Sequence, residues 1–279
     1  IFEGMGVGFI SLSISLLALL IKILFNVDGF YLALICISTI TFFCLISLIN
    51  GRLVRLKTIN ISSNKVRGKM SLAFISDVHL GSNSEKHLQE IFNALKKINF
   101  DILLIGGDLI DSSSFNLESL NIFNSVNKPI LFVTGNHEHY LTDWSKISKK
   151  LHEFNIKNID GKTFKFKELN IIGVGDNLTI DKQKLKILNN YKKEKFNLVL
   201  SHKPSLWMEV PEKIDLLLAG HTHKGQIFPF NLIVKLKFNE IYGIYKRIGS
   251  TLYVSSGSGC WGPKMRLGSQ NEVVEIKID

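Results

Sequence analysis

Two long apolar stretches near the start of the chain limit its fold more than any other feature. Residues 7–25 carry a single charge, Lys22, and residues 30–49 carry none. A helix of about twenty apolar residues is long enough to cross the roughly 30 Å hydrocarbon core of a bilayer. A polar turn of hairpin size, residues 26–29, separates the two stretches. We therefore predict a transmembrane helical hairpin within residues 1–51. A signal peptide is the alternative for the first stretch, but the second apolar stretch follows at once and no cleavage-like site separates them.

The charges beside the second stretch predict its orientation. Arg52, Arg55 and Lys57 follow it closely without an accompanying acid, whereas the turn between the stretches carries only Asp28. Basic residues that flank membrane spans remain on the cytoplasmic side. We expect the rest of the chain to face the cytoplasm and to be anchored to the inner, cytoplasmic membrane.

The remainder of the chain has the pattern of an α/β domain. Residues 71–76 and 101–106 are short apolar runs typical of buried strands, and residues 85–98 between them have apolar side chains at helical spacing. Strands that alternate with helices and are then followed mostly by strands predict a layered α/β architecture. We expect this domain to span residues 70–279, with residues 52–69 as a juxtamembrane connector.

The charge and the cysteines limit the possible partners. The chain of 279 residues contains 34 Lys and Arg against 24 Asp and Glu, a net charge of +10. A positive charge attracts anionic substrates and lipid headgroups. The lysines are scattered along the chain, and the sequence contains no long Arg-rich run, so we expect no specific nucleic-acid partner. Three cysteines without paired spacing argue against a disulfide framework.

Polar residues follow the predicted strands at places where apolar packing does not explain them. In chain order they are Asp77, His79, Asp108, Asn136, His137, His202, His221 and His223. Open α/β sheets bind ligands at the carboxyl ends of their strands. Asp, Asn and His supply oxygen and imidazole donors that suit manganese, iron or zinc rather than calcium. Any one of these residues has an ordinary explanation as a turn, a cap or a surface histidine, but as a set they predict a metal site.

These blocks, in this order, resemble the calcineurin-like metallophosphoesterase family, whose motifs are D-x-H, GD, GNH[ED], a single His and GHxH. The resemblance covers roughly residues 71–225. It implies a layered β-sandwich flanked by helices that holds two divalent metal ions, with manganese expected first and iron or zinc as alternatives. It implies that one metal is bound by Asp77, His79, Asp108 and His223. It implies that the second is bound by Asp108, Asn136, His202 and His221. Asp108 would then bridge the two metals, and His137 would be the catalytic proton donor.

A narrower resemblance covers the C-terminal part. The segments 220–226, 242–245 and 256–268 resemble the YkuE-type membrane-anchored branch of this family. Residues 228–238 mix apolar side chains with two lysines, a composition suited to a membrane interface or an acyl-chain groove, with a buried hairpin or strand as the alternative. Arg266 is a candidate to bind the substrate phosphate, because guanidinium groups bind phosphate through paired hydrogen bonds; a surface arginine is the alternative.

These observations predict a membrane-anchored, dinuclear-metal phosphoesterase. The YkuE-type branch includes enzymes that cleave the pyrophosphate of UDP-2,3-diacylglucosamine to UMP and lipid X in lipid A synthesis. The resemblance therefore implies a lipid-linked substrate of this kind, and a phosphodiesterase or phosphatase for another phospholipid or for a nucleotide is the alternative. A non-enzymatic membrane scaffold is the third hypothesis; it predicts lost motif residues, whereas Asp108 and His137 are both present.

Overall fold

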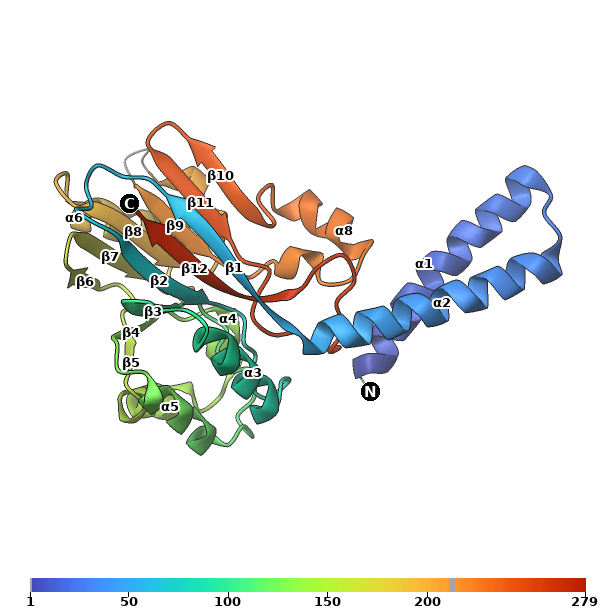
Figure 1. The fold of residues 1–279 in the computed structure, drawn as a ribbon, viewed down its shortest axis with the longest axis horizontal. Coiled ribbons are helices and arrows are strands. Elements are labelled where there is room, and N and C mark those ends of the chain that lie inside the picture. The colour runs from blue at the N-terminus through green and yellow to red at the C-terminus, as the bar shows by residue number, and fades with distance from the viewer. Residues whose placement is uncertain (1, 211–213) are drawn as a thin grey trace.

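The computed structural model describes residues 2–210 and 214–279 and shows a helical hairpin projecting from a two-sheet domain (Figure 1). The hairpin consists of α1 (Phe2–Phe25) and α2 (Gly29–Arg52). Both helices are long and apolar enough to cross a membrane. Asp28 begins α2 by accepting hydrogen bonds from the backbone N–H groups of Phe30 and Tyr31, at 2.9 and 3.3 Å. The predicted helical hairpin is confirmed.

The first sheet contains six strands in the order β1-β12-β2-β3-β4-β5. Their bounds are β1 Val54–Ile61, β2 Met70–Ile75, β3 Ile102–Ile105, β4 Ile130–Phe132, β5 Ile156–Asn158 and β12 Asn271–Ile278. Strands β2 to β5 pair in parallel, whereas β12 lies antiparallel to β2 and parallel to β1. The carboxyl ends of β2, β3 and β4 consequently meet at one edge of this sheet.

The second sheet also contains six strands, in the order β10-β11-β9-β8-β7-β6. Their bounds are β6 Thr163–Phe166, β7 Leu169–Val174, β8 Phe196–Ser201, β9 Leu216–Ala219, β10 Gly243–Arg247 and β11 Ser250–Val254. The central strands β7, β8, β9 and β11 are parallel, and the outer strands β6 and β10 are antiparallel to their neighbours. The first sheet thus pairs β1 and β12 from distant parts of the chain, whereas the second sheet is built from strands within residues 163–254.

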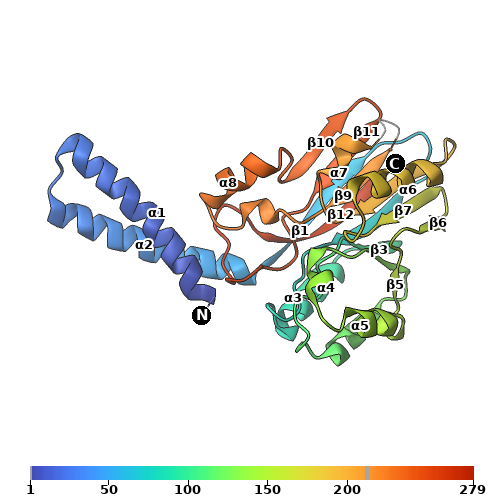
Figure 2. The same cartoon turned by 180° about the vertical axis from the view of Figure 1, so that it is seen from behind.

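The two sheets pack face to face, and helices cover their outer faces (Figure 2). The remaining helices are α3 Glu85–Leu95, η1 Leu117–Ser125, α4 Asn136–Tyr140, α5 Trp144–Lys150, η2 Leu151–Phe154, α6 Ile180–Asn190, α7 Leu206–Glu209, η3 His223–Gly225 and α8 Phe230–Lys237. Apolar side chains such as Phe74 of β2 and Leu200 of β8 form the core between the sheets. Leu88 and Phe92 of α3 pack on the outside of the first sheet. This arrangement confirms the predicted β-sandwich flanked by helices.

The structure differs from the expected connector over residues 52–69, because this segment contains β1. Only Leu53 separates the end of α2 from the start of β1. The strand pairs with β12 along its whole length, and Ile59 and Ile61 are buried in the core. The membrane hairpin is therefore joined to the sheet directly, without a flexible linker over residues 54–61.

The end of α2 is also held by hydrogen bonds to the C-terminal part of the domain. The side-chain amide of Asn271 donates to the carbonyl of Gly51 at 2.9 Å, and the backbone N–H of Arg266 donates to the carbonyl of Ser47 at 2.8 Å. A Cβ atom at Gly51 would collide with the backbone of Lys264. The hairpin and the sandwich consequently pack closely at this junction.

Candidate metal centre

The predicted site residues lie in loops that follow five strands and converge at one edge of the sandwich. Asp77 follows β2, Asp108 follows β3, and Asn136 follows β4 in the first sheet. His202 follows β8 and His221 follows β9 in the second sheet. The strand ends of both sheets thus supply donors to the same place, as expected for an α/β sheet.

The backbone at five of the seven predicted ligands adopts a left-handed conformation, which residues other than glycine rarely adopt. These φ values are 52° at Asp77, 50° at His79, 51° at Asp108, 71° at His221 and 49° at His223. Backbone strain of this kind concentrates at functional sites, where the surrounding structure maintains it. The tight bends bring side chains from different loops within contact distance.

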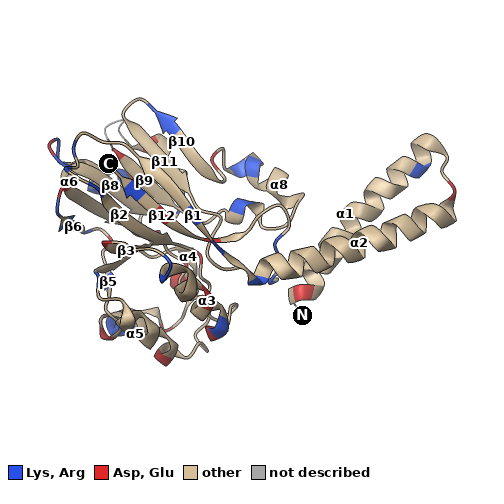
Figure 3. Cartoon of the chain, in the orientation of Figure 1, with Lys and Arg blue, Asp and Glu red and all other residues tan. Residues whose placement is uncertain are grey.

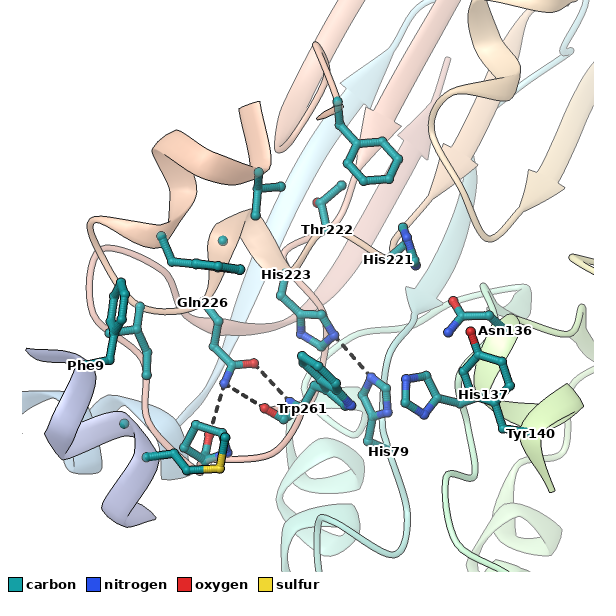
Figure 4. Close-up of a pocket in the computed structure, with 18 residues that line it drawn as sticks. Phe9, His79, Asn136, His137, Tyr140, His221, Thr222, His223, Gln226 and Trp261 are labelled. Carbon is teal, nitrogen blue, oxygen red and sulfur yellow. Dashed lines mark hydrogen bonds between the residues drawn. The ribbon is translucent and has the colours of Figure 1, made fainter. Parts of the chain in front are cut away.

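The first cluster of donors brings together two imidazole rings and two carboxylates. Nε2 of His79 lies 3.1 Å from Nε2 of His223 (Figure 4). Nε2 of His223 lies 3.5 Å from Oδ1 of Asp77, and Nε2 of His79 lies 3.8 Å from Oδ2 of Asp108. Two imidazole nitrogens facing each other beside carboxylates form a donor set that fits a divalent cation.

The second cluster is built around His202. Its Nε2 lies 3.0 Å from Nδ1 of His221, 3.2 Å from Oδ1 of Asn136 and 3.2 Å from Oδ2 of Asp108. Oδ2 of Asp108 therefore takes part in both clusters. This arrangement could hold two adjacent cations, with Asp108 contributing to both.

Neighbouring groups orient two of the imidazole rings toward the clusters. Nδ1 of His202 lies 2.9 Å from the carbonyl of Gly106 and donates to it, which directs Nε2 toward the cluster. Nδ1 of His79 lies 3.2 Å from Oδ2 of Asp111, so this carboxylate faces the side of the ring away from the cluster. Nε2 of each ring consequently faces the position where a metal would bind.

Glu138 holds two of the site loops together. It is fully buried and accepts hydrogen bonds from the backbone N–H groups of Asp108, Leu109, Ile110 and Gly135, at 3.0, 2.6, 3.1 and 2.7 Å. Three of these donors belong to the loop after β3, and the fourth precedes α4. From the sequence alone, Glu138 could orient His137 or cap the next turn, and its hydrogen bonds to the loop after β3 were not apparent. The available signal was the position of Glu138 three residues after a helix N-cap, where an acid satisfies free backbone N–H groups.

The charges of the site strongly influence its histidines. Burial lowers the pKa of His202, but the nearby carboxylate of Asp108 outweighs this effect and raises the pKa to about 10. Burial and the neighbouring His202 lower the pKa of His221 to about 2. In the absence of metal, the imidazole of His202 is therefore protonated and positively charged at neutral pH, whereas that of His221 is neutral.

His137 lies beside the clusters and belongs to neither of the hydrogen-bonded sets described above. Its ring centroid is 4.7 Å from that of His79, in an edge-to-face arrangement. Its backbone N–H donates to Oδ1 of Asp108 at 2.9 Å. The ring is partly exposed to the adjoining cavity, and burial lowers its pKa. The predicted proton donor is thus close to the site and accessible from the cavity.

Arg266 does not have the exposed position that phosphate binding requires. Its side chain is fully buried, and it donates to the side chains of Asn271 and Ser269 and to the carbonyls of His223 and Gly259. One guanidinium nitrogen also lies 3.2 Å from Nδ1 of His223. The predicted substrate contact is corrected accordingly: Arg266 supports the left-handed backbone of His223 from behind, because the protein itself occupies its donors.

A cavity of about 680 Å³ adjoins the clusters. It begins at the predicted ligands and continues over apolar side chains of α8 to the first turns of α1, where Phe9 lies at its far end (Figure 4). Residues 228–238 contain α8, which has no buried residue, so the alternative of a buried hairpin or strand is wrong. The apolar segment instead forms one wall of the cavity.

A two-sheet sandwich with adjacent Asp and His clusters at its strand ends defines a class of metal-dependent hydrolases. The model of the calcineurin-like phosphoesterase family matches residues 70–225, which is more than half of the chain. The chain belongs to this family, as the motif resemblance predicted.

Several relatives share both the domain and its name. An uncharacterized metallophosphoesterase of Helicobacter pylori is 31% identical over 237 residues, which cover 80% of this chain and 64% of the relative. An uncharacterized metallophosphoesterase of Aquifex aeolicus is 31% identical over 73% of this chain and 82% of its own length. A transmembrane protein with metallophosphoesterase domain of Danio rerio is 30% identical over 75% of this chain and 53% of its own length. The alignment thus spans less than two thirds of the Helicobacter and Danio relatives.

Proposed function

We propose that this chain is a membrane-anchored phosphoesterase that hydrolyses a phosphoester or pyrophosphate bond in a lipid-linked substrate, with UDP-2,3-diacylglucosamine as the first candidate. The observation that carries the proposal is the cavity, which connects the His and Asp clusters with apolar residues of α8 and α1. A substrate with a phosphate group and acyl chains matches both ends of this cavity.

The proposed organisation has a membrane hairpin over residues 1–51 and a catalytic domain over residues 70–279. The strand β1 connects the two parts. The basic residues after α2 favour a catalytic domain on the cytoplasmic side of the inner membrane. In this position the enzyme reaches lipids of the cytoplasmic leaflet.

The proposed ligands of the first metal are Asp77, His79, Asp108 and His223. The proposed ligands of the second metal are Asp108, Asn136, His202 and His221. When bound, two divalent cations, with manganese as the first candidate, supply an activated water nucleophile and neutralise phosphoryl charge. The protein holds the donors in place through the hydrogen bonds of Glu138 and Arg266. Asp108 draws the two clusters together, because the same oxygen faces both.

His137 is the proposed proton donor to the leaving group. Its partly exposed ring faces the cavity beside His79, where the leaving oxygen of a bound phosphate would depart. An imidazolium at this position would give its proton to a developing oxyanion, and because burial holds the pKa of His137 below its ordinary value, this protonated form is favoured at acidic pH. The apolar wall of α8 would meanwhile hold the acyl part of the substrate and exclude water.

The test is release of UMP from UDP-2,3-diacylglucosamine by the detergent-solubilised chain with manganese. We expect release that EDTA abolishes and that Asp108→Ala lowers at least about a thousandfold, because the shared ligand of both clusters is lost. The matched control is Asp181→Ala on the exposed face of α6, which should retain full activity.

Two other outcomes would change the proposal. Cleavage of an aryl phosphodiester without UMP release would retain the hydrolase and reject this substrate in favour of another phospholipid or a nucleotide. Failure to cleave either compound with manganese, iron or zinc would reject hydrolysis and favour a membrane scaffold. UDP-N-acetylglucosamine, which lacks acyl chains, should be a poor substrate if the apolar wall binds lipid.

A further inference from the structure

The helix α8 exposes an apolar surface that nothing in the described part of the chain covers. None of its residues is buried. The exposed fractions of its side chains are 42% for Phe230, 56% for Leu232, 54% for Ile233 and 88% for Leu236. Burying such side chains is favourable, so a surface of this kind indicates a partner.

The position of α8 beside the hairpin identifies this partner. Both views of the fold place α8 on the side of the domain that faces the hairpin (Figures 1 and 2). The rings of Phe230 in α8 and Phe9 in α1 lie edge to face with centroids 6.0 Å apart. Met5, Gly6 and Phe9 of α1 line the same cavity as Phe230 and Val234 of α8. The exposed surface of α8 is therefore continuous with the surface of a candidate membrane helix.

The length of α1 places this contact at the boundary of the bilayer. A helix of 24 residues is about 36 Å long, whereas the hydrocarbon core is about 30 Å thick. The first turns of α1 contact the domain, so we place the excess of about 6 Å at this end. Phe9 then lies just inside the hydrocarbon, and α8 lies at the level where acyl chains meet headgroups.

The charges of α8 agree with this depth. Lys235 and Lys237 occupy its last turn, and no acid lies within the helix (Figure 3). Helices that lie in a membrane interface combine apolar residues with lysines that contact anionic headgroups. A protein that bound α8 would not require α8 to lie at the same depth as the end of a membrane-spanning helix, so this coincidence favours lipid as the partner.

We propose that α8 is an interfacial helix that lies in the surface of the bilayer crossed by α1 and α2. Leu232, Ile233 and Leu236 enter the acyl boundary, and Lys235 and Lys237 contact anionic headgroups. The cavity between α1 and α8 then opens to the lipid phase, so a lipid substrate reaches the site from the side without passing through water. This inference rests on the membrane placement proposed above, but it does not require any particular substrate.

The test measures the depth of α8 with a fluorescent label on an introduced cysteine in the full chain, reconstituted into phosphatidylcholine vesicles containing phosphatidylglycerol. The labelled variants are Leu236→Cys in α8, Leu17→Cys in α1 and Ile248→Cys in the turn between β10 and β11. Their parent side chains are all exposed, with fractions of 88%, 58% and 85%. The unsubstituted chain gives the background from its three cysteines. Nitroxide-labelled lipid and iodide serve as quenchers from the membrane and from water.

We expect lipid nitroxide to quench the labels at 17 and 236 several-fold more than the label at 248, and iodide to quench only the last. If lipid nitroxide quenched the label at 17 but not the label at 236, the membrane hairpin would be supported and the proposal that α8 lies in the interface would be rejected. A label at 236 protected from both quenchers would mean that a protein surface, such as a second copy, covers α8, and would also overturn it. Absence of lipid quenching at 17 would overturn both the membrane placement and this inference. Because quenching needs no catalysis, these outcomes are distinguishable from failure to hydrolyse the proposed substrate.

Discussion

At the residue scale, two buried carboxylates have different roles within one network. Asp108 directs one oxygen toward both donor clusters, while its other oxygen accepts the backbone N–H of His137. Glu138 contacts neither cluster in the described hydrogen bonds and instead anchors the backbone that carries Asp108. The position of the proposed shared ligand therefore depends on a fully buried residue whose carboxylate accepts backbone N–H groups.

Replacement of Glu138 by Gln tests this anchoring role. In the variant, the side-chain amide can accept hydrogen bonds only at its oxygen. Its NH₂ group would face a backbone N–H group that the carboxylate of Glu138 accepts in the parent protein. We expect Glu138→Gln to lower the free energy of unfolding by about 1–3 kcal/mol and to weaken metal binding. Urea unfolding and calorimetric titration with manganese measure the two effects. Glu90→Gln on the exposed face of α3 is the control and should change neither; equal behaviour of the two variants would refute the role.

The raised pKa of His202 predicts that metal binding depends on pH. Its pKa of about 10 in the metal-free protein means that this imidazole is protonated at pH 7.5, and a metal ligand must lose that proton. Metal affinity should therefore weaken as pH falls below about 10, by up to tenfold per pH unit. Calorimetry at pH 7.5 in buffers of different ionisation enthalpy should show release of about one proton per bound metal pair. Binding without proton release would contradict the proposed ligand.

At the element scale, local sequence patterns predicted the central strands. They did not predict β1, because that strand depends on pairing with a distant part of the chain. The expected strands over residues 71–76 and 101–106 correspond to β2 and β3, because buried parallel strands are continuous apolar runs. In β1, charged and apolar residues are mixed, and its partner β12 lies at the other end of the chain. No local signal could reveal that pairing.

The same distinction applies to the site. The ligand candidates could be predicted as a set because their motifs follow successive strands, and the order of these motifs can be read directly from the sequence. The burial of Arg266 was not predictable, because it depends on acceptors at His223 and Gly259 that only the folded chain brings near. Short motifs thus predicted the chemistry, whereas the supporting contacts required the structure.

The close packing between α2 and the sandwich gives a prediction at the same scale. In Gly51→Ala the new methyl group would collide with the backbone of Lys264, so the helix end must move and its hydrogen bond to Asn271 must lengthen. We expect a loss of about 1–3 kcal/mol in stability, measured by thermal unfolding in detergent. Gly8→Ala in α1 is the matched control, since no heavy atom lies within 4 Å of its Cβ position. Similar stability of the two variants would argue against a packed junction.

At the scale of the whole molecule, the candidate metal centre joins the two sheets. Its donors come from loops after β2, β3 and β4 in one sheet and after β8 and β9 in the other. Without metal, carboxylates and imidazoles remain close together in a largely buried site, where unpaired polar groups are unfavourable. Bound metal is therefore expected to stabilise the sandwich as well as to serve catalysis.

Removal of metal should consequently lower the melting temperature. A ligand present at a hundred times its dissociation constant stabilises a fold by about 2.7 kcal/mol, which for a domain of this size corresponds to roughly 5–10 °C. Scanning fluorimetry with manganese and with EDTA measures this shift. Asp108→Ala should show almost no difference between the two conditions, and an equal shift in that variant would place the stabilising metal elsewhere.

The single residue between α2 and β1 has a consequence for how such an enzyme would meet its substrate. A catalytic domain on a long flexible linker can move through a large volume of solution above the membrane, whereas this domain would be held at a fixed distance from the bilayer surface. Its encounters would then be collisions in a plane, governed by the surface density of the lipid and its lateral diffusion. Dilution of the substrate lipid within the bilayer should slow turnover, while dilution of the vesicles themselves should not.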